Sequence, residues 1–203
     1  MKKAILITFC VVLGLSTLSF AGRNADVAKG AIHVRAHNAK AGCASGISGC
    51  EDIVMTEPTF SFDAFPVFYD LVEYKACEYS VIWPDWTYSA TFNSCSDFVI
   101  GEILWPGDGV SHAWTLCQNS SVCAPAYLWI YADGPGQVCI SGHPQHGSAF
   151  LVDCIDGVDV LIGWGCAGVY GGTPDPASGD ACGVLPEPAT EPTTWGEIKG
   201  LFQ

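Results

Sequence analysis

The chain has 203 residues, of which 49% are hydrophobic and 14% are charged, a composition typical of a folded globular protein and not of a disordered one. Eight basic residues stand against 21 acidic ones, so the formal net charge at pH 7 is −13. An acidic surface with no basic stripe repels nucleic acid and anionic lipid headgroups, which argues against nucleic acid as a partner.

The chain begins with the pattern of a secretory signal, residues 1–21. Two lysines open it, an apolar stretch follows to residue 18, and Ser19-Phe20-Ala21 supplies a small-x-small cleavage site. The apolar stretch is too short to span a bilayer, and no later segment is long and apolar enough to do so. We therefore expect a secreted or cell-surface protein with no transmembrane segment, whose mature chain begins at Gly22.

Ten cysteines follow the signal, an even number in an oxidising compartment, which favours five disulfides over metal ligation. No Cys-x-x-Cys pair of the kind that binds zinc is present. They are Cys43, Cys50, Cys77, Cys95, Cys117, Cys123, Cys139, Cys154, Cys166 and Cys182. The flexible or turn-rich loops between them favour the pairs 43–50, 139–154, 95–117 and 166–182, which leaves 77 with 123.

Residues 22–170 predict a single domain of short strands. Apolar runs that alternate with polar residues are separated by turns rich in Gly, Pro and Asp. In chain order the expected strands lie at residues 32–37, 52–55, 60–74, 77–83, 88–92, 98–104, 112–117, 126–131, 137–141, 149–154 and 158–162. In one of them, Cys77, Tyr79, Val81 and Trp83 share a face. This spacing predicts an all-β fold, a single antiparallel β-sandwich.

The pattern changes after residue 170. Residues 171–193 are rich in Pro and Gly and predict an extended tether. Residues 194–203 begin with a capping-box match between Thr194 and Glu197 and predict a short amphipathic C-terminal helix. A helix of two turns is marginal alone, so this segment is expected either to dock on its own domain or to engage export or surface machinery.

Several segments resemble a family of uncharacterised, cysteine-rich secreted bacterial proteins. They include Tyr79-Ser-Val-Ile-Trp83, Pro106-Gly-Asp-Gly-Val-Ser-His-Ala-Trp114 and the closing Glu191-Pro-Thr-Thr-Trp-Gly-Glu-Ile-Lys-Gly-Leu-Phe202. The resemblance covers most of the mature chain and implies no activity. More loosely, strand 77–83 with the Pro-Asp corner after it is similar to cohesin-like and related immunoglobulin-like sandwiches, which implies a binding or structural module.

Metal ligands are sparse in the sequence. His143-Pro-Gln-His146 is the one close histidine pair, and its proline argues against a helix that would present both rings to zinc. Asp108, Asp156 and Asp159 lie in or beside turns, where calcium finds oxygen ligands, but Asp-Gly is also ordinary turn chemistry. We expect no bound metal or cofactor, and these five residues are the candidate ligands for zinc or calcium.

The expected function is a secreted binding, adhesion or cell-envelope structural module, with an extracellular glycan or protein as its ligand. Trp86 and Trp105 lie near strand ends, where indoles form a platform for a ligand. The alternative is a secreted hydrolase that uses carboxylates or a site containing histidine. Its candidate carboxylates are Asp63, Asp70, Asp85, Asp97 and Asp108, whereas His33 and His37 fall on a polar strand face and are expected at the surface.

Overall fold

The computed structural model describes residues 22–24, 27–57, 59–84, 88–161 and 163–175. These residues form thirteen β-strands and a single 3-10 turn at Cys50–Asp52. None of their helical turns is long and apolar enough to cross a membrane. The predicted signal, Asp85, Trp86, Cys182, most of the tether and the C-terminal segment lie outside the described residues.

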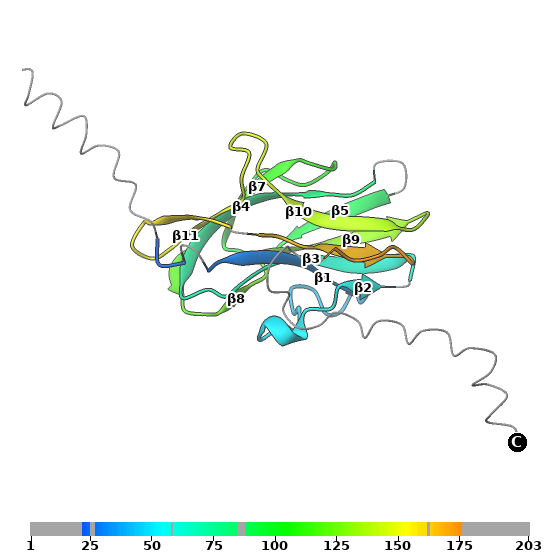
Figure 1. Ribbon diagram of the computed structural model, residues 1–203, viewed down its shortest axis with the longest axis horizontal. Helices are drawn as coiled ribbons and strands as arrows, with labels where there is room; N and C mark the ends of the chain where they lie inside the picture. The colour runs from blue at the N-terminus through cyan, green and yellow to red at the C-terminus, as the bar shows by residue number, and fades with distance from the viewer. Residues whose placement is uncertain (1–21, 25–26, 58, 85–87, 162, 176–203) are drawn as a thin grey trace, which may run out of the picture.

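The strands form two sheets that lie face to face (Figure 1). The first sheet has the order β1 (Lys29–Ala36), β3 (Ser61–Tyr69), β9 (Ala126–Ala132), β5 (Tyr88–Ser94), with β8 (Val122–Cys123) also paired to β3. The second has the order β12 (Val158–Val160), β11 (Phe150–Val152), β4 (Tyr74–Ile82), β10 (Gly136–Ser141), β13 (Cys166–Val169), β2 (Thr56–Glu57). In the second sheet β7 (Gly109–Gln118) also pairs with β4, and β6 (Phe98–Ile100) pairs with β7. Every pair is antiparallel except β13 with β2, so the predicted antiparallel sandwich is confirmed.

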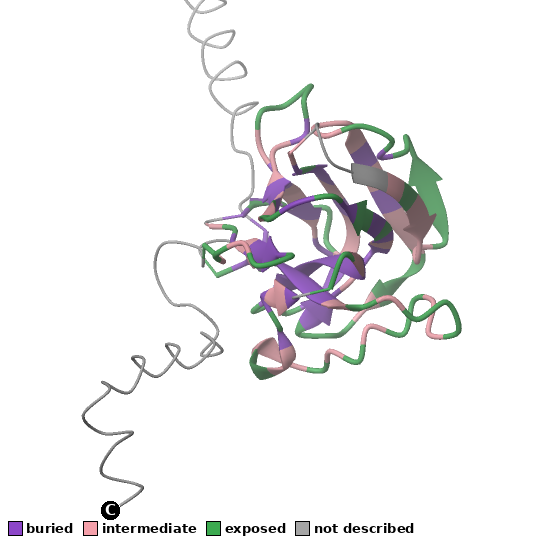
Figure 2. Cartoon of the chain, turned by 90° about the vertical axis from the view of Figure 1, so that its right-hand side faces the viewer, coloured by how far each residue is buried: buried purple, intermediate pink, exposed green. Residues whose placement is uncertain are grey.

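The core lies between the two sheets, where buried residues concentrate (Figure 2). Strand alternation supplies it, because every second side chain points inward. The predicted inward residues Cys77, Tyr79 and Val81 of β4 are all buried, as is Trp83 just after its end. The ring of Tyr79 packs edge to face against the ring of Phe68, which comes from the opposite sheet. The two ring centroids lie 5.3 Å apart. Aromatic area from both sheets therefore joins them at the centre of the domain.

The disulfides differ from the predicted pairs. The structure joins Cys43 to Cys95, Cys117 to Cys154 and Cys139 to Cys166, and Cys50 is also disulfide-bonded. The predicted pairs 43–50, 139–154, 95–117 and 166–182 are therefore wrong. Cys139 and Cys166 show the reason, since they stand opposite each other in the register of β10 and β13, which are distant in sequence. Loop length between neighbouring cysteines carries no information about such pairing.

Cys77 and Cys123 are thiols in the structure, which departs from the expectation that all ten cysteines are bridged. They are neighbours, as predicted, because β4 and β8 present them from opposite sheets. Both lie in the core, with exposed fractions of 0% and 1%. Burial raises the pKa of the Cys77 thiol well above its usual value.

The domain extends a little beyond the predicted boundary at residue 170. The chain turns back after β13, and Asp175 forms a bridge with Cys166. Their backbones exchange two hydrogen bonds, with N···O distances of 2.7 and 2.9 Å. Residues 171–175 thus belong to the folded domain and not to the tether.

Candidate functional site

A loop between β10 and β11 interrupts a strand that is otherwise continuous along β4. β10 ends opposite Ser80, and β11 begins opposite Glu78, both on the edge of β4 that β7 leaves free. An unbroken strand would place one residue opposite Tyr79, but residues 142–149 occupy that position. Because Tyr79 points into the core, Glu78 points outward, beneath this loop. Figure 1 shows the loop standing out from β4 and β7.

The loop brings the two predicted histidines to Glu78. A backbone bond from His143 N to Ser148 O (2.9 Å) and another from His146 N to His143 O (3.0 Å) close the turn. Nε2 of His146 lies 3.3 Å from Oε2 of Glu78. One ligand atom from each of Glu78, His143 and His146 lies within 4.8 Å of the other two. A turn thus brings the histidines together where the proline rules out a helix.

A pocket of about 250 Å³ opens beside these side chains. Its lining includes Glu78, both histidines, Ser111 of β7 and Ile100 of β6. The absence of a side chain at Gly109 makes room for the His143 ring, because a Cβ at residue 109 would lie 2.4 Å from Nε2 of His143. The His143 side chain is therefore held against β7 and has an exposed fraction of only 8%.

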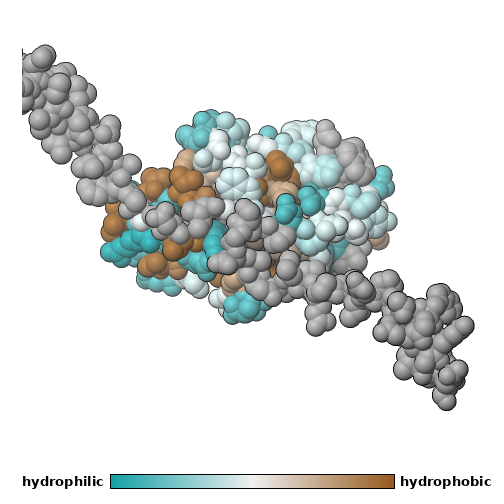
Figure 3. All heavy atoms as spheres, in the orientation of Figure 1, coloured by the Kyte–Doolittle hydropathy of each residue, from teal (hydrophilic) through white to brown (hydrophobic). Residues whose placement is uncertain are grey.

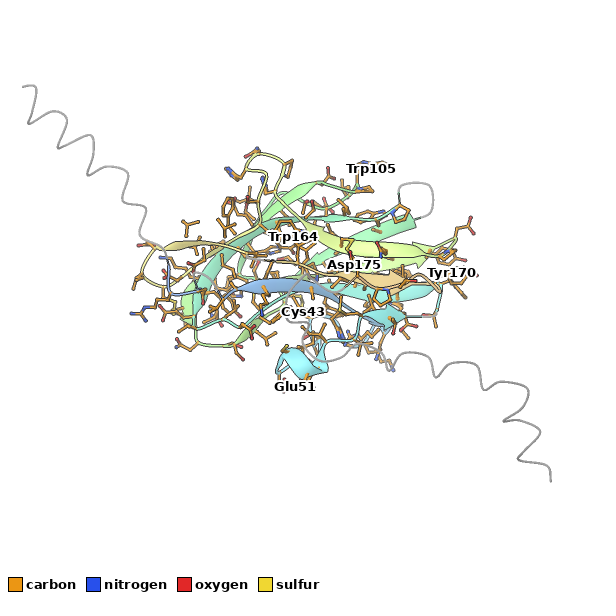
Figure 4. The ribbon with its side chains drawn as sticks, viewed as in Figure 1. Cys43, Glu51, Trp105, Trp164, Tyr170 and Asp175 are labelled. Carbon is orange, nitrogen blue, oxygen red and sulfur yellow. A yellow bond between two sulfur atoms is a disulfide. The ribbon has the colours of Figure 1, made fainter. Side chains whose placement is uncertain are left out.

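Beside the pocket, the outermost strand exposes a row of large apolar side chains. Phe98, Val99 and Ile100 of β6 are 60%, 41% and 77% exposed, and Leu104 and Trp105 in the following turn are 53% and 70% exposed. We call these five residues the apolar edge. Trp105, one of the two predicted ligand residues, lies at the outer margin of the molecule (Figure 4). Among the described residues, β6 pairs with β7 alone.

A second group of exposed apolar residues lies at the far end of the same sheet. Ile155, Val158 and Val160 are about half exposed, at 58%, 52% and 49%. In Figure 3 hydrophobic surface gathers at the end of the molecule that carries β11, with hydrophilic atoms among it. We call these three residues the end patch. It differs from the apolar edge, because β12 exposes only alternate residues whereas β6 exposes all three.

The structure does not bring the three predicted calcium ligands together. Asp108 accepts hydrogen bonds from the backbone N–H groups of Leu104 and Trp105, at 3.1 and 2.8 Å, and so shapes its own turn. Asp156 is exposed and pairs with Lys75, whereas Asp159 is buried. None of the three belongs to a described cluster with metal-ligand spacing. The only such cluster besides the histidine cluster contains Glu73 with Cys117 and Cys154, which are bonded to each other.

The carboxylates proposed for a hydrolase have separate local partners. Asp63 is buried and accepts from His37 Nδ1 (2.6 Å) and Arg35 Nε (3.4 Å). Asp70 pairs with Lys29 at 3.4 Å, and Asp97 accepts from the backbone and hydroxyl of Thr115, both at 2.7 Å. Together with the turn at Asp108, these contacts assign the four described candidates structural roles.

Two histidines are buried away from the pocket. The expectation that His33 lies at the surface is wrong, because its exposed fraction is 6% and its Nδ1 accepts the N–H of Val54 at 3.0 Å. His112 lies between the sheets, 1% exposed, with Nε2 3.1 Å from the hydroxyl of Tyr79 and Nδ1 2.7 Å from that of Ser96. Burial lowers the pKa of each imidazole to about 4. Both are therefore neutral at pH 7.

Sequence reasoning found the histidine pair and Trp105 but missed Glu78 and the β6 row. The alternation of β4 places Glu78 outward, between inward-facing Cys77 and Tyr79, and that signal was readable. Its meeting with the loop depends on how β10 and β11 pair with β4, which no local pattern shows. Phe98-Val-Ile100 reads as a buried strand because three apolar residues in a row usually lie in a core.

No family model and no curated protein matches the chain. A search of solved structures returned cohesin modules, all with low sequence identity. The sixth cohesin of scaffoldin B from Acetivibrio cellulolyticus, solved with a Cel5 dockerin, aligns with a TM-score of 0.44 and 9% identity over 70% of this chain and 96% of that one. The seventh ScaB type I cohesin from Pseudobacteroides cellulosolvens aligns with a TM-score of 0.44 and 7% identity, over 70% and 90% of the two chains. The second type II cohesin of the adaptor scaffoldin ScaA from A. cellulolyticus has a TM-score of 0.43 and 5% identity, over 70% and 96%.

Proposed function

We propose that this protein is a secreted binding module whose apolar edge receives an extended, apolar segment of a partner protein. The observation that carries the proposal is the exposure of every side chain on β6, at the margin of a sheet. An edge strand offers unpaired backbone N–H and C=O groups to an added strand. Natural proteins usually protect such an edge with charges or prolines, and β6 has neither.

Burial of this row is a sufficient source of affinity. Fully covering a side chain such as Phe98 or Ile100 contributes about 1.5–3 kcal/mol, and the row contains several of them. Association and ordering costs offset part of that gain, so the added backbone bonds are needed for specificity. Trp105 extends the surface and supplies an anchor with one polar end.

The test uses a phage-displayed library of random 12-residue peptides, selected on the immobilised protein. We expect enrichment of peptides that alternate apolar with polar residues and lack proline. The double variant F98T/I100T should reduce their binding at least tenfold, since it removes two apolar contacts while keeping strand propensity. The control is V158T/V160T, which makes the same kind of change on the end patch and should bind as the unmodified protein does.

Two results would contradict the proposal. The first is that the library yields no enriched peptide, and the second is that both double variants lose binding equally. Binding to a glycan array that is abolished by Trp105→Ala and unaffected by F98T/I100T would instead favour a sugar platform.

A second candidate function, a zinc-dependent hydrolase, is favoured by the convergence of Glu78, His143 and His146 beside the pocket. Two ligand atoms of tetrahedral zinc lie about 3.3 Å apart, and His146 Nε2 and Glu78 Oε2 are separated by 3.3 Å. One contact opposes it: Nδ1 of His143 accepts the N–H of Gln145 at 3.3 Å, so the ring proton lies on Nε2. Zinc on Nε2 would move that proton to Nδ1 and break the bond.

We therefore expect purified protein to contain zinc well below one atom per chain, and the double variant H143A/H146A to retain peptide binding. Inductively coupled plasma mass spectrometry after dialysis against zinc measures the first, and the phage-derived peptides measure the second. His37→Ala is the control for loss of a half-buried imidazole outside the pocket. Stoichiometric zinc that disappears only in H143A/H146A would favour the hydrolase.

A further inference from the structure

The first described residues lie in a buried acidic site. Gly22 and Asn24 are buried, and around them stand Asp153, Asp159 and Glu73, with exposed fractions of 0%, 2% and 8%. We call these three acidic residues the N-terminal cradle. Buried carboxylates are costly unless each has a positive or hydrogen-bonding partner, so their partners show how complete the site is.

Two of the three carboxylates have either several hydrogen-bond donors or a cation beside them. Asp153 accepts the backbone N–H groups of Arg23, Ile155 and Gly157, at 2.8, 2.9 and 2.7 Å. Glu73 Oε1 has no hydrogen bond among the described residues, but the Arg23 guanidinium compensates its charge, with Oε1 and Nη1 3.1 Å apart. These contacts tie the start of the chain to the β11–β12 turn and to the segment before β4.

Asp159 differs from both, because no cation among the described residues pairs with it. Its Oδ2 accepts the N–H of Asn24 at 3.0 Å, but its Oδ1 is buried without a hydrogen-bond partner among the described residues. Gly22 packs against this carboxylate. If Gly22 carried a Cβ atom, that atom would lie 2.4 Å from Oδ1 and 2.5 Å from Oδ2 of Asp159. A side chain there would displace the carboxylate of Asp159, so glycine allows the close approach.

Gly22 is also the residue that the predicted signal cleavage makes first in the chain. Hydrolysis of the Ala21–Gly22 peptide bond by water gives a carboxylate on Ala21 and a free amine on Gly22. At neutral pH this amine is protonated, since an α-amino group has a pKa of about 7.7–8.0. Processing therefore replaces a neutral amide with a cation that has three N–H donors, next to a buried carboxylate that lacks one.

We propose that the α-ammonium group of Gly22 is the missing partner of Asp159, so that removal of the signal completes the N-terminal cradle. The ion pair locks the start of the mature chain to β12. It is independent of the binding role of the apolar edge, which lies on other strands. It also explains why a glycine follows the cleavage site: a larger first residue would keep the charge but could not approach the carboxylate.

The experiment compares two chains that differ by one residue, both ending at Gln203. One begins at Gly22, and the other retains Ala21 in front of it, which moves the charge by about 3.8 Å, one Cα spacing. We expect the extended chain to melt roughly 5–10 °C lower, because it leaves a buried carboxylate without its cation. When both chains also carry Asp159→Asn, they should melt within about 2 °C of each other. The extra residue and the substitution then have non-additive effects, as expected for two groups in direct contact. Asp156→Asn removes an exposed carboxylate from the turn before β12, so it should preserve the full difference.

A second readout uses the native protein without substitutions. Labelling of the α-amine by 2-pyridinecarboxaldehyde at pH 7 should be at least tenfold slower in the folded chain than in urea, because the ion pair sequesters the amine. Equal melting temperatures of the two chains, or equally fast labelling of folded and unfolded protein, would overturn the proposal. So would a calcium-dependent rise in melting temperature that is lost in Asp159→Asn while the amine stays reactive, since a metal ion would then occupy the cradle.

Discussion

Acidification from pH 7 to 4.5 is expected to lower the free energy of unfolding by about 4 kcal/mol through two buried histidines. In the folded protein the pKa of His33 and that of His112 are each lowered to about 4, chiefly by burial. In the unfolded chain an imidazole has a pKa of about 6.5. Between these values the unfolded state binds more protons, so stability falls as the pH decreases through this window. Below about pH 4 both states are protonated and this contribution is fully lost.

Guanidinium denaturation at pH 7, 5.5 and 4.5 measures the effect. His112→Gln should reduce the loss between pH 7 and 4.5 by about 2 kcal/mol, since it removes one of the two titrating groups. His146→Gln is the matched control, because it removes an exposed imidazole in place of a buried one. A free energy of unfolding that stays constant from pH 7 to 4.5 would show that neither buried ring changes its pKa on folding.

The two core thiols are expected to react with Ellman's reagent at least about a thousandfold more slowly in the native protein than in urea. Cys77 and Cys123 are 0% and 1% exposed, so the sheets must separate before a reagent reaches them. With an unfolding free energy of about 5 kcal/mol or more, the open population is below roughly one in a thousand. Burial also raises the pKa of Cys77, which removes the reactive thiolate.

Kinetics of colour development in buffer and in urea, both without reductant, measure this protection. Denatured protein should release the signal of both core thiols, and a sample reduced beforehand gives the total cysteine content for comparison. If denatured protein gives no thiol at all, Cys77 and Cys123 are bridged, as the sequence alone predicted. Rapid reaction in buffer would show instead that the interior opens locally.

The parts of this fold that a sequence can predict are those set by neighbours along the chain. The alternation from Cys77 to Trp83 identified the buried face of β4, because the pleat repeats every two residues. His33 shows where the same rule fails: alternation says nothing about what covers the second face of a strand, and Phe65, which pairs with His33 on that face, is buried as well. The burial of His33 involves Val54, which is 21 residues away in the chain.

The candidate site shows the same limit. Trp105 follows a strand and precedes a turn, and both features are local, so its exposed position could be expected. The meeting of Glu78 with His146 joins residues 68 positions apart, and it exists only because β10 and β11 both pair with β4. The disulfide between Cys139 and Cys166 depends on strand register in the same way.

The eight residues between β10 and β11 have a consequence for how this domain can change. Ser80 and Glu78 of β4 hold the two flanking strands in place, two residues apart, whatever lies between them. The length and composition of residues 142–149 can therefore vary without a shift in either register. This makes the loop a natural insertion point, where new recognition segments can be grafted onto an unchanged sandwich. Replacing it with a single residue would restore one continuous strand opposite Tyr79.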